Sequence, residues 1–202
     1  MRTPSRVRVR RRLVAALVVP VAAAFVLAGC TETPDYGQSA TNGYVSGSGV
    51  YKEIKPADRK QPLSFTSKLD TGAKITSADL KGKVYVVNFW YAGCAPCNAE
   101  APRLNSVYKK YGDTVGFLGV NTYDQAATAQ TFEQAHDVKY PSAIDTNTAA
   151  IQYAFSSYVP PSAVPTTLVL DKQGRVAARV TGELDAASIL ETLIDTVVHE
   201  GQ

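Results

Sequence analysis

The chain has 202 residues, of which 45% are hydrophobic and 19% charged, a composition typical of a globular protein with a buried core. Its net charge of +3 is unevenly distributed, because residues 1–30 hold six arginines and no acidic residue. The rest of the chain carries 15 basic and 18 acidic side chains. It therefore lacks the basic footprint that nucleic-acid binding requires, and we expect no nucleic-acid partner.

The first 30 residues predict an export signal. A basic start is followed by an apolar run of 15 residues, which is short for a membrane span, and then by "LAGC", residues 27–30. This order resembles the signal and lipobox of bacterial lipoproteins. The resemblance implies that Cys30 is lipidated and anchors the chain to the outer face of the cytoplasmic membrane. An ordinary signal peptide and an uncleaved anchor are the alternatives, and the export route stays open.

Residues 31–62 are rich in Gly, Ser, Thr and Pro and have no hydrophobic period, so we predict a flexible tether. From residue 63 the pattern changes to that of a folded domain, which we expect to continue to residue 202. Two short alternating segments around "DTGA" predict a hairpin within residues 64–83.

Strands and helices then alternate along the chain. The near-continuous apolar runs at 84–90 and 114–121 predict strands buried on both faces. The later strands "TTLVLD" and "RVAARVTG" are joined by a turn at Gly174. Helices are expected at 97–111, at 124–136 with Asp124 as cap, near 147–155, and from Asp185 to about 198. The order predicts an α/β domain with a central sheet covered by helices.

Two cysteines, Cys94 and Cys97, stand three apart after the first buried strand. If lipidation uses Cys30, they are the only thiols of the exported domain, in a compartment that permits disulfides. A zinc site would need further ligands, and His136 and His199 lack the spacing to supply them. A structural disulfide closing so short a loop would stabilise little. The pair is therefore predicted to be redox-active, with no metal.

The position of Cys94 predicts its role. It lies where a strand ends and a helix begins, and the helix N-terminus stabilises a thiolate and lowers the cysteine pKa. Pro96 suits the first turn of that helix. Cys97 is one turn further in and is expected to be more covered. We therefore expect Cys94 to attack and Cys97 to resolve.

The segments "NFWYAGCAPCNAEAP" (88–102) and "VPTTLVLDKQGRV" (164–176) resemble the TlpA/ResA-like thiol-disulfide oxidoreductases of the thioredoxin superfamily. The resemblance implies a thioredoxin-like fold, a central mixed β-sheet flanked by helices with an N-terminal hairpin extension. It also implies a redox disulfide between Cys94 and Cys97. The joint match of the cysteine pair, Glu-x-Pro and Val-Pro-Thr-Thr in this order is specific, whereas a lone Cys-x-x-Cys is not.

The same resemblance implies roles for four other residues. Glu100 corresponds to an acidic residue that these proteins keep beside the cysteine pair. It stands three residues after Cys97 on the same helix face, so it would relay the proton of the resolving thiol if partly buried, and a solvated helix acid is the alternative. Val164 and Pro165 correspond to a cis-proline bond that offers backbone to the substrate. Trp90 corresponds to an aromatic residue beside the site, counted here with the substrate-binding residues, although it could be plain core.

Two departures from the family pattern stand out. Asn88 occupies the position of a buried Asp in typical thioredoxins, although the TlpA-like branch commonly has Asn. Gly93 replaces a Trp found in many relatives directly before the first cysteine. We expect this change to leave Cys94 more open and to alter partner specificity.

The resemblance implies an extracytoplasmic protein-disulfide oxidoreductase without a cofactor, expected to be a monomer. Relatives mostly act as reductants, for example of apocytochrome c before haem attachment, and receive electrons from a membrane thiol donor. A protein-thiol oxidase is the main alternative. An AhpC/TSA-type peroxidase needs a Thr where this chain has Tyr91, and a copper chaperone needs Cys-x-x-x-Cys, so both are less favoured.

Overall fold

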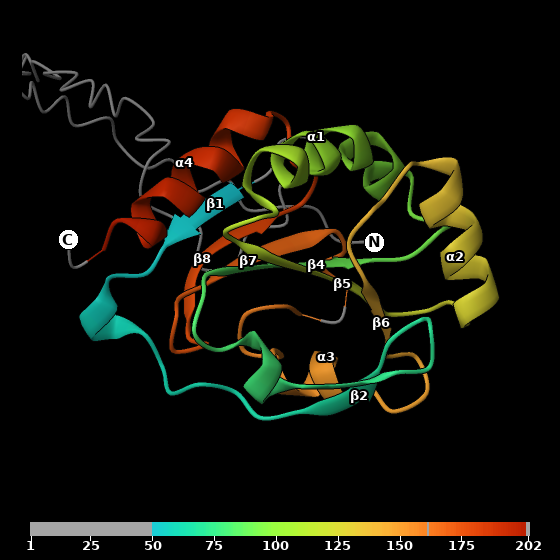
Figure 1. Ribbon diagram of the computed structural model, residues 1–202, viewed down its shortest axis with the longest axis horizontal. Coiled ribbons are helices and arrows are strands. Elements are labelled where there is room, and N and C mark those ends of the chain that lie inside the picture. Colours follow the sequence, from blue (N-terminus) through green and yellow to red (C-terminus); the bar gives the residue numbers. More distant parts are fainter. Residues whose placement is uncertain (1–49, 161, 201–202) are drawn as a thin grey trace, which may run out of the picture. The chain divides into compact units, whose positions relative to one another are not determined.

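The computed structural model describes residues 50–160 and 162–200 (Figure 1). The predicted signal, the lipidation residue Cys30 and the first part of the predicted tether lie outside the described residues. Within them, a six-stranded mixed sheet has the order β1-β8-β7-β4-β5-β6. β4, β5 and β6 run parallel to one another, and the other neighbours are antiparallel. The predicted central mixed sheet flanked by helices is confirmed.

The bounds of the elements agree with the predicted order. The sheet consists of β1 (Val50–Glu53), β4 (Tyr85–Trp90), β5 (Gly116–Asn121), β6 (Ser142–Ile144), β7 (Thr166–Leu170) and β8 (Val176–Thr181). The hairpin is β2 (Thr66–Lys68) with β3 (Lys74–Thr76), and the helices are α1 (Ala95–Tyr111), α2 (Ala126–Ala135), α3 (Ala150–Ala154) and α4 (Ala187–Val198).

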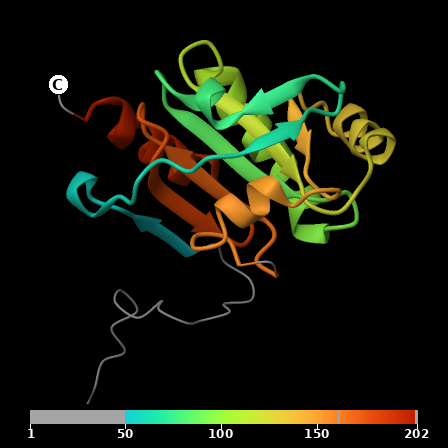
Figure 2. The same cartoon turned by 90° about the horizontal axis from the view of Figure 1, so that it is seen from below.

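Each face of the sheet carries its own hydrophobic core because side chains alternate along the strands. Val86 of β4 packs with residues of α1 and α4 on one face. Val87 and Phe89 pack on the opposite face with α3 and with the segment that holds the hairpin. Figure 1 shows α1 and α4 on one side of the sheet, and Figure 2 shows α3 and the hairpin over the other.

β4 and β5 lie side by side in the sheet and are buried along almost their whole length. This burial explains their near-continuous apolar sequences. Because the strands are parallel and in register, Trp90 and Asn121 end them at the same edge of the sheet. The loops that follow both strands therefore meet at this edge, where α1 begins with the cysteine pair.

The predicted hairpin is confirmed, with β2 antiparallel to β3 and Gly72 in the turn at a φ of 85°. The predicted turn between β7 and β8 is also present, and Gly174 adopts a φ of 81° there. Both glycines occupy the left-handed region that side chains disfavour.

The ordered domain begins earlier than the sequence pattern indicated. Val50–Glu53 forms the edge strand β1, paired with β8, within the stretch predicted to be a tether. Arg59 then lies buried, with ion pairs to Asp171 and Glu200. The expectation of a flexible chain up to residue 62 is therefore wrong for residues 50–62. The strand was missed because its four residues "VYKE" are mostly exposed and have no hydrophobic period.

Two predicted helix caps are corrected. α2 begins after Gln125, and the carboxylate of Asp124 instead accepts hydrogen bonds from Ala92 and Asn121. α4 begins after Ala186 without a side-chain cap, so Asp185 precedes the capping position. No helix in the described part of the chain is long and apolar enough to span a bilayer.

Candidate active site

Cys94 and Cys97 form a disulfide at the start of α1, with their Cα atoms 5.2 Å apart. Cys94 is the N-cap of the helix, and the backbone N–H of Cys97 donates to its Sγ across 3.2 Å. A sulfur in this position faces the positive end of the helix dipole. The arrangement stabilises a thiolate on Cys94 once the disulfide opens.

The two cysteines are equally buried, at 2% and 3% exposure for Cys94 and Cys97. The expectation that Cys97 is the more covered residue is therefore wrong for the oxidised form. Both belong to an apolar cluster that includes Trp90 and Phe132, with Val164 packed against it. The assignment of Cys94 as the attacking thiol consequently depends on its place at the helix N-terminus, not on exposure.

Side-chain amides and one carboxylate hold the loop that precedes the pair. Asn98 donates from Nδ2 to the carbonyls of Ala92 and Cys94, at 3.1 and 2.7 Å. The N–H of Ala92 donates to Asp124 Oδ2 at 2.6 Å, and Asn121 donates to the same oxygen. Asp124 and Asn121 belong to the end of β5 and its loop, so the neighbouring strand fixes the loop. The sequence offered no signal for Asp124 beyond its place near the start of a helix.

Glu100 is buried one turn after Cys97, at 1% exposure. Its Oε1 accepts a hydrogen bond from Asn88 at 2.9 Å, and its Oε2 accepts one from the backbone N–H of Leu184 at 2.8 Å. Burial raises the pKa of Glu100 to about 7, against the opposing effect of these two hydrogen bonds. The alternative of a solvated helix acid is therefore contradicted, and Glu100 can exchange a proton near neutral pH.

Asn88 links this carboxyl group to the strand that follows Pro165. Its Nδ2 donates both to Glu100 and to Thr167 Oγ1, the latter at 3.0 Å. An Asp at position 88 would lack these donors and would place a second carboxyl group beside Glu100. The Asn that replaces the usual Asp of thioredoxins is thus matched to the buried Glu.

The Val164–Pro165 bond is cis, as the resemblance implied. Pro165 is buried, and its carbonyl accepts a hydrogen bond from the N–H of Gly182. Val164 is half-buried and packs against the cysteine cluster. The structure thus brings Cys94, Cys97 and Val164, from segments about seventy residues apart, to the same place.

Trp90 lies beneath this surface. Its side chain is buried, and its ring stacks on Phe132 of α2 at a centroid distance of 4.5 Å. So little exposed area leaves no room for direct substrate contact. We propose that Trp90 supports the cysteine pair by packing, in place of the substrate-binding role expected from the resemblance.

Two tyrosines to which the sequence assigned no role at the site, Tyr91 and Tyr123, flank the cysteine loop. The rings of Tyr91 and Tyr123 lie 5.8 Å apart, and Tyr123 is 75% exposed. A Cβ built on Gly93 would lie 3.5 Å from the ring of Tyr91. Tyr91 thus occupies space beside Gly93, and Cys94 is not left open by the missing Trp. The two tyrosines are visible in the sequence, in "WYAG" and "NTYD", but the sequence does not show that their rings lie together.

The chain is similar to known proteins whose names describe thiol-disulfide chemistry. Residues 59–179 match the AhpC/TSA family. The chain is 36% identical to the thiol-disulfide oxidoreductase ResA of Bacillus cereus over 134 residues, which are 65% of this chain and 73% of the relative.

Two solved structures resemble the fold. A DsbF homologue from Corynebacterium diphtheriae superposes with a TM-score of 0.64 at 31% identity, covering 76% of this chain and 97% of the other. A secreted thiol-disulfide isomerase from Corynebacterium glutamicum gives 0.62 at 28% identity, covering 76% and 96%. The predicted thioredoxin-like fold is confirmed.

Proposed function

The chain belongs to the AhpC/TSA family and is a thiol-disulfide oxidoreductase, and we propose that it reduces disulfides of exported proteins. In this proposal Cys94 attacks a substrate disulfide and forms a mixed disulfide. Cys97 then attacks Cys94, which releases the reduced substrate and leaves the Cys94–Cys97 disulfide seen in the structure. A membrane thiol donor returns the pair to the dithiol form.

The observation that carries this proposal is the buried carboxyl group of Glu100, one helical turn after Cys97. With a pKa of about 7, it can accept the proton of Cys97 as that thiol becomes the attacking thiolate. Its charged form also disfavours a second negative charge nearby, which opposes a stable Cys97 thiolate. Both effects suit a pair that passes electrons on to a substrate.

Substrate contact is assigned to Val164 and Pro165, which border the cysteine cluster. Among the described residues, no acceptor is hydrogen-bonded to the backbone N–H of Val164, so this group is available to an extended chain. A disulfide in an apocytochrome c, within its Cys-x-x-Cys-His haem-attachment motif, is the substrate we propose on the basis of the family resemblance. The main chain near Val164 would hold such a segment while Cys94 reacts.

The direction of electron flow is tested by the reduction potential of the pair, measured by equilibration with glutathione. A reductant should have a potential near that of thioredoxin, about −270 mV, and should reduce a disulfide-bonded Cys-x-x-Cys-His peptide. A potential near −120 mV, together with oxidation of the dithiol peptide, would overturn the reductase proposal and leave the oxidoreductase activity in place.

One observation favours the second candidate, a protein-thiol oxidase. The N–H of Cys97 donates to Cys94 Sγ at the helix N-terminus, and a stabilised thiolate stabilises the reduced form of the pair. The helix N-terminus stabilises a thiolate, whereas the charged form of Glu100 disfavours one nearby. The reduction potential shows which of these two effects is larger.

For the location, we propose an extracytoplasmic domain tethered through a lipid on Cys30. The signal-like residues 1–30 and the "LAGC" sequence support this. The similarity to a secreted isomerase agrees with export. Residues 31–49, the part of the proposed tether that lies outside the described residues, would connect Cys30 to β1.

A further inference from the structure

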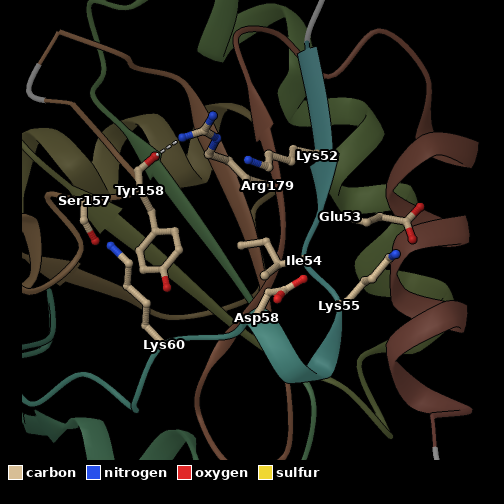
Figure 3. A pocket seen from close by; sticks show the side chains of 9 residues that line it. All are labelled: Lys52, Glu53, Ile54, Lys55, Asp58, Lys60, Ser157, Tyr158 and Arg179. Atoms are coloured by element: carbon tan, nitrogen blue, oxygen red, sulfur yellow. Dashed lines mark hydrogen bonds between the residues drawn. The ribbon is translucent and has the colours of Figure 1, made fainter. Parts of the chain in front are cut away.

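A cleft of about 420 Å³ opens where β1 and the segment after it face the loop that follows α3 (Figure 3). Its volume lies in the range of small-molecule sites. Arg179 of β8 and Tyr158 form part of its wall. None of the residues that line it belongs to the cysteine site, so its chemistry is not explained by disulfide exchange.

The cleft gathers positive charge. In Figure 3, Lys52, Lys60 and Arg179 surround the cavity, whereas Glu53 and Lys55 point away from it toward α4. Of the charged residues that line the cleft, four are basic (Lys52, Lys55, Lys60 and Arg179) and two are acidic (Glu53 and Asp58). The cleft therefore has an excess of positive charge, whereas acidic side chains outnumber basic ones over residues 31–202 as a whole.

The charges are also placed unfavourably for an empty cleft. Lys52 pairs directly with Arg179 in the antiparallel register of β1 and β8, so both side chains extend from the same face. Like charges in directly opposite positions destabilise a sheet. Among the described residues, neither of them nor Lys60 forms an ion pair. No carboxylate of the described residues therefore neutralises these three side chains in a direct ion pair.

Arg179 and Lys60 contact neutral groups of Tyr158, which leave their positive charges uncompensated. Arg179 Nη1 donates to the carbonyl oxygen of Tyr158 across 2.9 Å. The ammonium of Lys60 lies 5.5 Å from the centre of the Tyr158 ring. Ser157 adds a hydroxyl group to the same wall. The cleft thus combines a fixed guanidinium, two flexible ammonium groups and a hydroxyl group.

We propose that this cleft binds a phosphate group. A guanidinium and ammonium groups are the side chains that recognise phosphate, and an anion would relieve the repulsion between Lys52 and Arg179. The phosphate could belong to a soluble ester or to an anionic phospholipid headgroup. The second source suits the position of β1, whose first residue, Val50, is twenty positions after Cys30.

The test measures thermal unfolding of the full chain in neutral detergent, with inorganic phosphate replacing chloride at constant ionic strength. Phosphate should raise Tm saturably in the wild type and in Lys109→Gln, a matched control on the exposed face of α1. Lys52→Gln should weaken the apparent affinity about tenfold, since one charge-assisted contact is lost. Without ligand, Lys52→Gln should leave Tm unchanged or higher, because it removes the repulsion.

The source of the phosphate is distinguished by repeating the titration with short-chain phosphatidylglycerol and with phosphatidylcholine. A response to inorganic phosphate supports a soluble ester, and a response to phosphatidylglycerol alone supports a headgroup. Arg179→Gln should also weaken binding, but it removes the contact to Tyr158, so Lys52→Gln is the deciding variant. No saturable rise with any probe, or equal weakening in Lys109→Gln, overturns the proposal.

Discussion

Asn88 on β4 donates a hydrogen bond to Glu100 on α1 across 2.9 Å, inside the core of the domain. A carboxyl group in such a place is costly to ionise, which raises the pKa of Glu100 to about 7. The amide and the N–H of Leu184 keep the group hydrogen-bonded in either protonation state. Glu100 is thus a buried acid that titrates near neutral pH, one helical turn after Cys97.

Glu100→Gln should flatten the pH dependence of stability between about pH 4.5 and 7. In that window the folded chain keeps a proton that the unfolded chain has lost, because the folded pKa is raised from 4.5 to about 7. The contribution of Glu100 is therefore most favourable below pH 4.5 and is lost as the pH rises through 7. It amounts to about 3 kcal/mol.

Urea unfolding of the oxidised protein at about pH 4.5, 6 and 8 checks this expectation. Relative to the wild type, Glu100→Gln should gain stability as the pH rises. Glu53→Gln, at an exposed position, should track the wild type throughout. Parallel curves for Glu100→Gln and the wild type would show that Glu100 ionises normally in the folded state.

Glu100→Gln should also slow resolution of mixed disulfides by Cys97. The variant keeps the shape of the side chain but cannot accept the thiol proton. General acid–base help is worth on the order of a hundredfold, and the pH–rate profile should lose its inflection near 7. Rapid-quench measurement from about pH 5 to 9 gives the rates, while the first attack by Cys94 serves as an internal control. Superimposable profiles would rule out proton relay.

Cys97→Ala should accumulate mixed disulfides through Cys94, because the attacking thiol remains and the resolving thiol is gone. Cys94→Ala should accumulate few, since Cys97 lacks the N-cap position that stabilises a thiolate. Non-reducing gels and mass spectrometry of each variant after exposure to a disulfide-bonded peptide make the comparison. Equal trapping by both variants would contradict the assignment of Cys94 as the attacking thiol. That assignment rests on the helix N-terminus alone, because the two cysteines are equally buried.

Arg59→Gln should destabilise the domain by about 2 kcal/mol, because it removes the hydrogen-bonded ion pairs of a buried guanidinium, although Asp171 keeps Arg175 as a partner. Its side chain is 2% exposed and pairs with Asp171 and Glu200. Arg103→Gln is the matched control, since Arg103 pairs with Glu183 at 35% exposure and should cost less than about 1 kcal/mol. Chemical unfolding measures both. A similar small loss in both variants would show that the buried ion pairs of Arg59 contribute no more than an exposed pair.

Cys30→Ala should abolish lipidation and release the chain from the membrane or trap its precursor. The reason is that the thiol of the "LAGC" sequence is the group that a lipid would modify. Membrane fractionation and intact mass of the mature chain test this, with Cys94→Ala as a cysteine control that should stay anchored. Unchanged mass and retention after Cys30→Ala would exclude the anchor.

The sheet and its helices were predictable because β4 and β5 are buried on both faces and therefore have continuous apolar sequences. β1 was not predictable, because an exposed edge strand of four residues has no periodic pattern and depends on pairing with β8. The cap predicted at Asp124 is wrong because of a tertiary contact that the sequence does not show. A carboxylate near a helix start can instead hold a neighbouring loop, as Asp124 does for Ala92.

The cysteine spacing, the Pro after the first cysteine and the Val-Pro-Thr-Thr segment are local features, so the sequence by itself determined the redox chemistry and where the helix begins. Tertiary structure alone decided the environment of each group. Burial of both cysteines, the packing of Tyr91 against Tyr123 and the cationic cleft arise from segments distant in the chain. The raised pKa of Glu100 has the same origin, because desolvation depends on what packs around a carboxyl group and not on its sequence neighbours.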